Sequence, residues 1–135
     1  MMAGNTPQTI NNESQESFPI QLESKSDEQV AHELTLKASI KYNVSFNELW
    51  ETIGCETQWT YISSLQSYQL YRFSDPKRGI VKGQRELSYG LAQIHLPDHP
   101  EVTLQQATDP VFATDFIAKN WTKHKTWWSC WTNKQ

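Results

Sequence analysis

Apolar side chains recur with helical spacing along residues 27–42. The positions concerned are four residues apart, and they are Val30, Leu34, Ala38 and Tyr42. Residues at this spacing share one face of a helix, so the segment is predicted to be an amphipathic helix. Ser26 followed by Gln29 is typical of a capping box at its start. Asn43 suits the left-handed conformation that often ends a helix.

A second helical pattern starts at Ser45, with Glu48 three residues on as in a capping box. Its apolar face is formed by Phe46, Leu49, Trp50, Ile53 and Thr57. At about 100° of rotation per residue, Glu56 lies about 20° from Leu49, so its carboxylate falls on this apolar face. The same rotation places Glu48 and Glu51 on the solvated side.

The position of Glu56 has a chemical consequence. A carboxylate on a core-facing stripe loses hydration, which disfavours its charged form. Glu56 is also close to the C-terminal end of the predicted helix, where the helix dipole is negative. Both effects raise the pKa of the carboxyl, as a general acid that works near neutral pH requires. The alternative is a glutamate that reaches solvent or pairs with an arginine, and helix position alone favours that alternative.

The helical spacing stops between residues 60 and 86, where aromatic residues partly alternate with polar ones as in strands. Ser74-Asp75-Pro76-Lys77 predicts a turn. We therefore expect an irregular loop with one weak β-hairpin, formed by residues 68–73 and 79–84. Such an insertion would form one wall of a cleft beside Glu56.

Shorter helical patterns follow in the C-terminal half. The run from Leu91 to Leu96 predicts a short helix that ends at Pro97. Within it Gln93 is either a buried amide bonded to backbone or a contact to a ligand. A capping pattern at Thr103 predicts another short helix. Asp109-Pro110 predicts the start of a helix over 110–125, with a buried face of Phe112, Ala113, Phe116, Ile117 and Trp121.

Composition and charge limit the function classes. The chain has 135 residues, enough for one domain, and its net charge is −3. Residues 1–60 contain three Lys/Arg and nine Asp/Glu, whereas residues 61–135 contain nine and six. No strongly basic face of the kind found in nucleic-acid-binding proteins is indicated. The mildly basic second half suits a polyanionic partner such as a cell wall.

The N-terminal residues differ from the rest. Residues 1–25 are mostly Asn, Gln, Ser, Glu and Thr, so we predict a disordered leader or tether there and a single domain over 26–135. The start has neither the basic nor the apolar region of a signal peptide. A membrane span needs about 18 consecutive apolar residues, and no stretch approaches that length.

The cysteines and the histidines limit the disulfides and metal sites that the chain can form. Cys55 and Cys130 are the two cysteines. An even count in a small chain permits one disulfide, and two buried thiols in a reducing compartment are the alternative. His95 and His99 are four residues apart, but Pro97 separates them and no third ligand is evident, so no metal site is expected. No other cofactor is expected.

Four short motifs occur in a fixed order, and it is this order that is informative. They are Cys-Glu-Thr at 55–57, Ser-Tyr-Gly-Leu-Ala-Gln-Ile at 88–94, Ala-Thr-Asp-Pro-Val-Phe-Ala at 107–113, and a Trp-rich end with Cys130. Together they resemble the lysozyme-like superfamily, in particular the soluble lytic transglycosylase domain. There a Glu-Ser closes one helix, Gly-Leu-x-Gln-Ile opens the next, and Asp-Pro opens a later one. The resemblance covers roughly residues 29–132.

The cysteines resemble those of resuscitation-promoting factor domains, which share a Cys-Glu-Ser and a late Trp-x-x-Cys. That likeness implies a disulfide between Cys55 and Cys130. The fold implied is mainly α (α+β, lysozyme-like), a small helical domain with the irregular insertion after the catalytic helix. A wall-cleaving enzyme acts outside the cytoplasm, where such a bridge persists, so we expect an extracytoplasmic monomer.

The resemblance also implies roles for single residues. Glu56 would be the catalytic acid/base, and Thr57 stands where the family has Ser. Three cleft residues are implied beside it, namely Tyr89, Gly90 and Gln93. Glu86 is the nearby second carboxylate, either at the substrate or in a salt bridge with Arg85 or Arg72. Asn120-Trp121 is the nearest match to an Asn-Tyr that many transglycosylases place against the acid.

The expected activity is cleavage of peptidoglycan strands between MurNAc and GlcNAc, leaving 1,6-anhydro ends. A hydrolytic lysozyme and a wall-binding module without catalysis are the alternatives. A structural domain with two free thiols is a further one. They differ in the products released from cell wall and in the state of Cys55 and Cys130.

Overall fold

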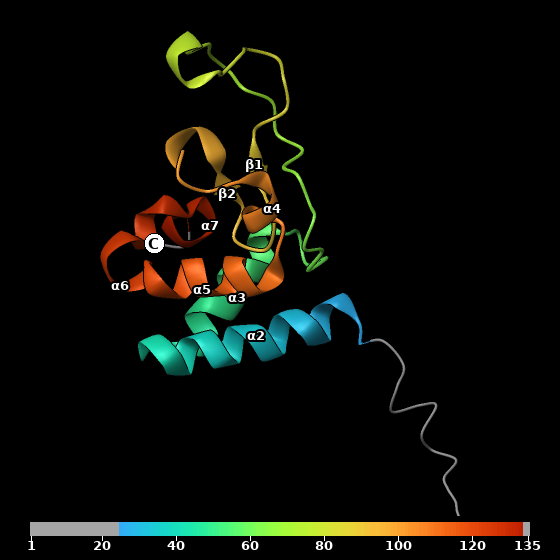
Figure 1. The fold of residues 1–135 in the computed structure, drawn as a ribbon, viewed down its shortest axis with the longest axis vertical. Coiled ribbons are helices and arrows are strands. Elements are labelled where there is room, and N and C mark those ends of the chain that lie inside the picture. Colours follow the sequence, from blue (N-terminus) through green and yellow to red (C-terminus); the bar gives the residue numbers. More distant parts are fainter. Residues whose placement is uncertain (1–24, 134–135) are drawn as a thin grey trace, which may run out of the picture.

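The computed structural model describes residues 25–133, so the predicted leader lies outside the described residues except for its last position. The described part is a small, mainly helical domain with a two-stranded sheet (Figure 1). Its α-helices are α2 (Asp27–Tyr42), α3 (Phe46–Glu56), α4 (Leu104–Ala107), α5 (Pro110–Lys119), α6 (Trp121–His124) and α7 (Ser129–Thr132). Within residues 25–133, no helix has the length and apolar character needed to cross a bilayer.

Helix α2 has the predicted caps but a different buried face. Ser26 and Gln29 form the reciprocal capping box, and Asn43 ends the helix with a φ of 55°. The fully buried residues of α2 are small, namely Ala31, Thr35, Ala38 and Ser39, whereas the larger apolar residues that we predicted there are only partly buried. Helix α5 packs against α2, and its own buried residues are also mostly small, namely Ala113, Thr114, Ile117 and Ala118. Small side chains let two helices approach closely.

Helix α3 buries Leu49 and Ile53 completely, as predicted. The expectation for Glu48 is wrong, because its carboxylate is not simply solvated. It accepts hydrogen bonds from Trp121 Nε1 at 2.8 Å and from Lys125 Nζ at 3.1 Å. The C-terminal segment therefore covers α3 at Glu48, whereas Glu51 on the same side is exposed as predicted.

The helix predicted over 110–125 is interrupted at Asn120. Asp109 caps its start as expected, by accepting from the N–H of Val111. Asn120 then leaves helical geometry at ψ 3°, and its side-chain amide donates to the carbonyl of Phe116 at 2.9 Å. Short polar side chains that bond to nearby backbone compete with helix continuation. The chain turns through α6 and the 3-10 helix η3 (Lys125–Trp127).

Residues 66–89 form an arm that rises from the helical body as the green-to-yellow ribbon of Figure 1. Its two runs are antiparallel, with isolated bridges Gln66↔Tyr89, Leu70↔Arg85 and Asp75↔Ile80. The 3-10 helix η1 (Pro76–Arg78) forms its tip. The predicted weak hairpin is therefore present, but its register differs, because Leu70 lies opposite Arg85 and not opposite a residue of 79–84.

A chain of polar contacts fastens the arm to the body. Tyr71 Oη lies 2.7 Å from Nε2 of His95, and Nδ1 of His95 lies 2.8 Å from Oδ2 of Asp98. Asp98 ends the 3-10 helix η2 (Leu96–Asp98) and forms an ion pair with Arg78 at the arm's tip. These contacts hold the arm at both its middle and its end.

The prediction of a short helix that starts at Leu91 is wrong. Strands β1 (Ser88–Tyr89) and β2 (Ile94–His95) pair antiparallel, and residues 90–93 form the turn between them. Gly90 has a φ of +82°, and a Cβ there would lie 1.8 Å from the carbonyl oxygen of Ala107. Only glycine fits such a position. Trp128 Nε1 donates to the carbonyl of Ala92 at 2.7 Å and fixes the turn against the C-terminal segment.

Candidate active site

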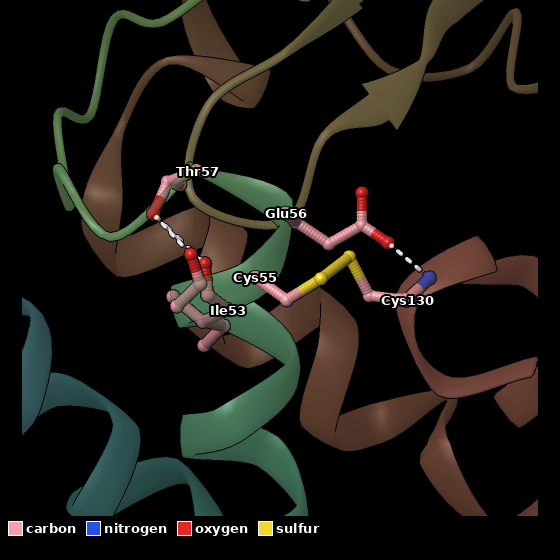
Figure 2. The surroundings of a disulfide bond; sticks show 6 residues. Ile53, Cys55, Glu56, Thr57 and Cys130 are labelled. Atoms are coloured by element: carbon pink, nitrogen blue, oxygen red, sulfur yellow. Dashed lines mark hydrogen bonds between the residues drawn. A yellow bond between two sulfur atoms is a disulfide. The ribbon is translucent and has the colours of Figure 1, made fainter. Parts of the chain in front are cut away.

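Glu56 is the last residue of α3, and its carboxylate points toward the start of α7 (Figure 2). The main-chain N–H of Cys130 donates a hydrogen bond to Glu56 Oε2 at 3.1 Å. The other carboxylate oxygen, Oε1, points away from Cys130. One oxygen is therefore held by backbone, and the second is available to a substrate.

The pKa of Glu56 is raised from its ordinary value of 4.5 to about 7. Burial is the main cause, because it disfavours the anion. The hydrogen bond from Cys130 acts in the opposite direction, and the negative charge of Glu86 raises the pKa further. The predicted direction of the shift is confirmed. A carboxyl with this pKa can both donate and accept a proton near neutral pH.

A pocket of about 240 Å³ surrounds this carboxylate. Its walls come from the end of α3, the base of the arm, the turn at 90–93 and the start of α7. Its lining is mostly amides, hydroxyls and carboxylates, from Cys55, Glu56, Gln58, Leu65, Ser67, Tyr68, Gln69, Glu86, Gln93, Ser129 and Cys130. Such a lining suits a ligand rich in hydroxyl and amide groups.

The disulfide between Cys55 and Cys130 is present, with Cα atoms 6.0 Å apart. It joins the residue directly before Glu56 to the residue whose N–H binds Glu56 (Figure 2). The bridge thus holds α7 against the end of α3 and closes one side of the pocket. The alternative of two free thiols is excluded in this structure.

Gln93 lines the pocket with only one of its polar atoms free for a ligand. Its Nε2 donates to the carbonyls of Leu65 at 3.0 Å and Gly90 at 2.9 Å. Both hydrogens of the amide are used in this way. The remaining Oε1 can accept a hydrogen bond from a ligand. Both alternatives considered for Gln93, a backbone-bonded amide and a ligand contact, are therefore compatible with its position.

Glu86 also lines the pocket, as the second carboxylate near Glu56. Its Oε1 accepts a hydrogen bond from Ser88 Oγ at 3.2 Å. In the described part of the chain it has no ion pair with Arg85 or Arg72. Arg85 instead donates to the main-chain carbonyls of residues 66 and 67.

Three residues expected at the cleft do not line the pocket. Thr57 is fully buried and points away from the carboxylate of Glu56 (Figure 2). Its hydroxyl donates to the carbonyl of Ile53 at 2.8 Å, so it caps α3. Tyr89 packs against the core, and Gly90 makes the tight turn. Asn120 lines a different hollow and does not reach Glu56.

The motifs did not identify several pocket residues, namely Gln58, Ser67, Tyr68, Gln69 and Ser129. Those of the arm lie in a stretch without helical periodicity, where the partial alternation predicted a hairpin but no pocket. Gln58 has a φ of 53° and Gln93 a φ of 45°. Left-handed backbone is uncommon in residues other than glycine and clusters at functional sites. Sequence alone does not reveal that conformation.

Two hollows of about 290 and 330 Å³ adjoin Trp127, and the first of them shares Gln93 with the pocket of Glu56. Neither includes Glu56. The first contains Asp98, and its bonds with His95 and Arg78 lower the pKa of this carboxyl, against the effect of burial. An ionised, ion-paired carboxylate is unsuited to donate a proton, so we place the candidate active site at Glu56.

No cluster of three or more metal-ligating side chains occurs within residues 25–133. Compared with known proteins, the chain matches no family model, no curated protein and no solved structure. The geometry of the pocket and the motif order are therefore the grounds for a function.

Proposed function

We propose that this chain is a peptidoglycan-cleaving glycosidase of the lysozyme-like type, a lytic transglycosylase in which Glu56 is the single acid/base. The observation that carries the proposal is the carboxyl of Glu56, which is partly buried at the end of α3 in a polar pocket and has a pKa of about 7. The order of the four motifs is a second, independent support.

The mechanism follows from the two oxygens of Glu56. Oε2 is held by the N–H of Cys130, so Oε1 carries the proton that is transferred to the leaving glycosidic oxygen. The bond from the anomeric carbon to that oxygen breaks, and the N-acetyl group of the substrate stabilises the positive charge that develops. Glu56, now ionised, removes the proton of the sugar's own 6-hydroxyl, whose oxygen attacks the anomeric carbon. The product is a 1,6-anhydro sugar, and no water is consumed.

Glu86 supports one alternative outcome. Most glycosidases use two carboxylates, one of which activates water or acts as a nucleophile. Glu86 lines the same pocket and bears no ion pair within the described residues. A water activated by Glu86 would give hydrolysis and reducing ends. A module that binds the wall without cutting it would release no products.

The decisive experiment is mass analysis of the products from purified peptidoglycan. We expect anhydro ends from the wild-type chain and no release by Glu56→Gln. Glu51→Gln is the matched control, because Glu51 lies on the same helix but outside the pocket. Wild-type turnover in Glu56→Gln would overturn the proposal. Reducing ends would replace it with a lysozyme.

We also propose that the protein acts outside the cytoplasm. The disulfide supports this location, because such bonds persist in oxidising compartments and are rare in the cytosol. Mass spectrometry of protein from its native source, alkylated before any reduction, tests it. Free Cys55 and Cys130 in that sample would contradict it.

A further inference from the structure

We infer that one face of the arm binds carboxylates of the polymer that is cleaved at Glu56. This face is formed by Tyr68, Leu70, Arg72 and Arg85. The carboxylates would be those of the peptide stems that branch from wall glycan. The inference rests on the proposed function for the identity of the polymer and extends it to substrate selection.

The four side chains lie near one another on the arm. Tyr68, Leu70 and Arg72 are all exposed on the same run of the arm, and Leu70 and Arg72 line the same hollow. Leu70 lies directly opposite Arg85, and residues directly opposite each other share a face. The guanidinium of Arg85 lies 5.0 Å from the ring centroid of Tyr68, as this arrangement requires.

This face is continuous with the candidate active site. Tyr68 lines the pocket of Glu56. Gln69 lines that pocket and also the next hollow, which contains Leu70, Arg72 and Lys82. A chain-like ligand with one sugar at Glu56 would therefore continue along the arm. A surface for an unrelated partner would have no reason to begin inside the pocket.

The arm is basic in a chain that is acidic as a whole. Residues 66–89 contain five Lys/Arg and two Asp/Glu, whereas the net charge of the whole chain is −3. Arg78 is ion-paired with Asp75 and Asp98. The other four cations, Arg72, Lys77, Lys82 and Arg85, form no ion pair with a carboxylate of residues 25–133. Arg72, Lys77 and Lys82 are therefore available to an anionic ligand, whereas Arg85 donates from Nε and Nη2 to main-chain carbonyls and has only its remaining N–H groups for one.

The apolar members of the face indicate what else the ligand carries. Tyr68 is 63% exposed and Leu70 is 58% exposed. Exposed apolar groups beside unpaired cations fit a ligand that offers both sugar or alkyl surface and carboxylates. A peptide stem attached to a sugar has both, whereas a glycan strand freed of stems keeps only the lactyl carboxylate on each MurNAc and lacks the carboxylates farther along the stem.

The test measures binding in the Glu56→Gln background, so that cleavage does not alter the ligand. Two insoluble probes are compared, intact peptidoglycan and the same material after an amidase has removed the stems. We expect Arg72→Gln and Arg85→Gln each to weaken binding to intact wall by about two- to fivefold, with little effect on stem-free glycan. Lys123→Gln, at an exposed cation of α6 away from the arm, is the matched control and should bind like the parent.

Each outcome has one meaning. Equal loss on both probes, or no loss on either, overturns the inference. Tighter binding to phosphatidylglycerol vesicles than to wall also overturns it and assigns the arm to a membrane surface. The proposed function is tested by a separate measurement, because it fails if the wild-type chain does not cleave peptidoglycan. Stem-dependent binding without cleavage would leave a wall-binding module with the same docking face.

Discussion

The main-chain N–H of Cys130 and the carboxylate of Glu56 are joined by a hydrogen bond of 3.1 Å, across 74 positions of sequence. The disulfide joins the same two segments, because Cys130 is bonded to the residue directly before Glu56. The bond distinguishes the two carboxylate oxygens, since it occupies Oε2. The same hydrogen bond lowers the pKa of Glu56, against the effect of burial. It therefore influences both which oxygen carries the proton and the pH at which that proton is lost.

Glu56→Gln should abolish cleavage and stabilise the fold at alkaline pH. The folded-state pKa is raised from 4.5 to about 7, so the folded chain binds this proton more tightly than the unfolded chain. The free energy of unfolding therefore falls as pH rises from 4.5 to 7, and the loss is complete above 7. Removing the charge should increase the free energy of unfolding by about 2–3 kcal/mol more at pH 8 than at pH 4.

Urea unfolding of both proteins at the two pH values measures this difference. If Glu56→Gln changed the free energy of unfolding by the same amount at both pH values, the raised pKa of Glu56 would be contradicted. Cleavage by the wild-type chain should decline above about pH 7, as the acid form is lost. Glu51→Gln should follow the wild-type pH profile.

The hydrogen bond from Cys130 can be tested apart from the disulfide. Cys55→Ala/Cys130→Ala and Cys55→Ala/Cys130→Pro both lack the bridge, but only the second lacks the N–H. Proline is tolerated here because residue 130 lies in the first turn of α7. The N–H lowers the pKa of Glu56, so the proline variant should lose activity at a higher pH than the alanine variant. Coincident pH profiles would show that the N–H does not act on Glu56.

Both variants also measure the bridge itself. It closes a loop with a sequence separation of 75, for which the chain-entropy model gives a stabilisation of about 4 kcal/mol. Unfolding of the wild-type chain with and without reductant should differ by a similar amount. A difference near zero would mean that the rest of the fold already holds α7 in place.

Gly90→Ala tests how tightly the turn beside the pocket is held. The new Cβ would meet the carbonyl of Ala107 at 1.8 Å, and the φ of +82° disfavours any side chain. We expect a loss of about 3 kcal/mol or more. Gly79→Ala is the matched control, since Gly79 has a φ of +71° but open space around it, and it should cost about 1 kcal/mol. Equal losses would show that backbone strain alone, and not contact with Ala107, requires glycine at position 90.

The sequence predicted those parts of the fold that depend on neighbours in the chain. The capping box of α2, the left-handed Asn43 and the start of α5 at Asp109 all involve residues at most four positions apart. The disulfide came from motif resemblance, not from local pattern. Its two cysteines are far apart in sequence, and nothing in their local surroundings specifies the pairing.

The predictions failed where distant segments decide the outcome. Leu91 to Leu96 has a helical composition, but Gly90 and the bond from Trp128 to Ala92 hold a turn there. Glu48 is on the predicted solvent side of α3, but the break at Asn120 brings Trp121 over it. The partial alternation in the arm predicted a hairpin but did not mark its pocket residues, because in an arm paired only through isolated bridges the exposed residues are not confined to alternate positions.

Glu86→Gln decides whether Glu56 works alone. The charge of Glu86 raises the pKa of Glu56, so its removal should lower that pKa and move the decline of activity to lower pH. If the 6-hydroxyl of the substrate is the nucleophile, the variant still cuts, and its products remain lighter than hydrolysis products by one water. If Glu86 instead activates a water, the variant loses most of its turnover and the wild-type products carry reducing ends. Glu101→Gln, outside the pocket, should leave both the products and the pH profile unchanged.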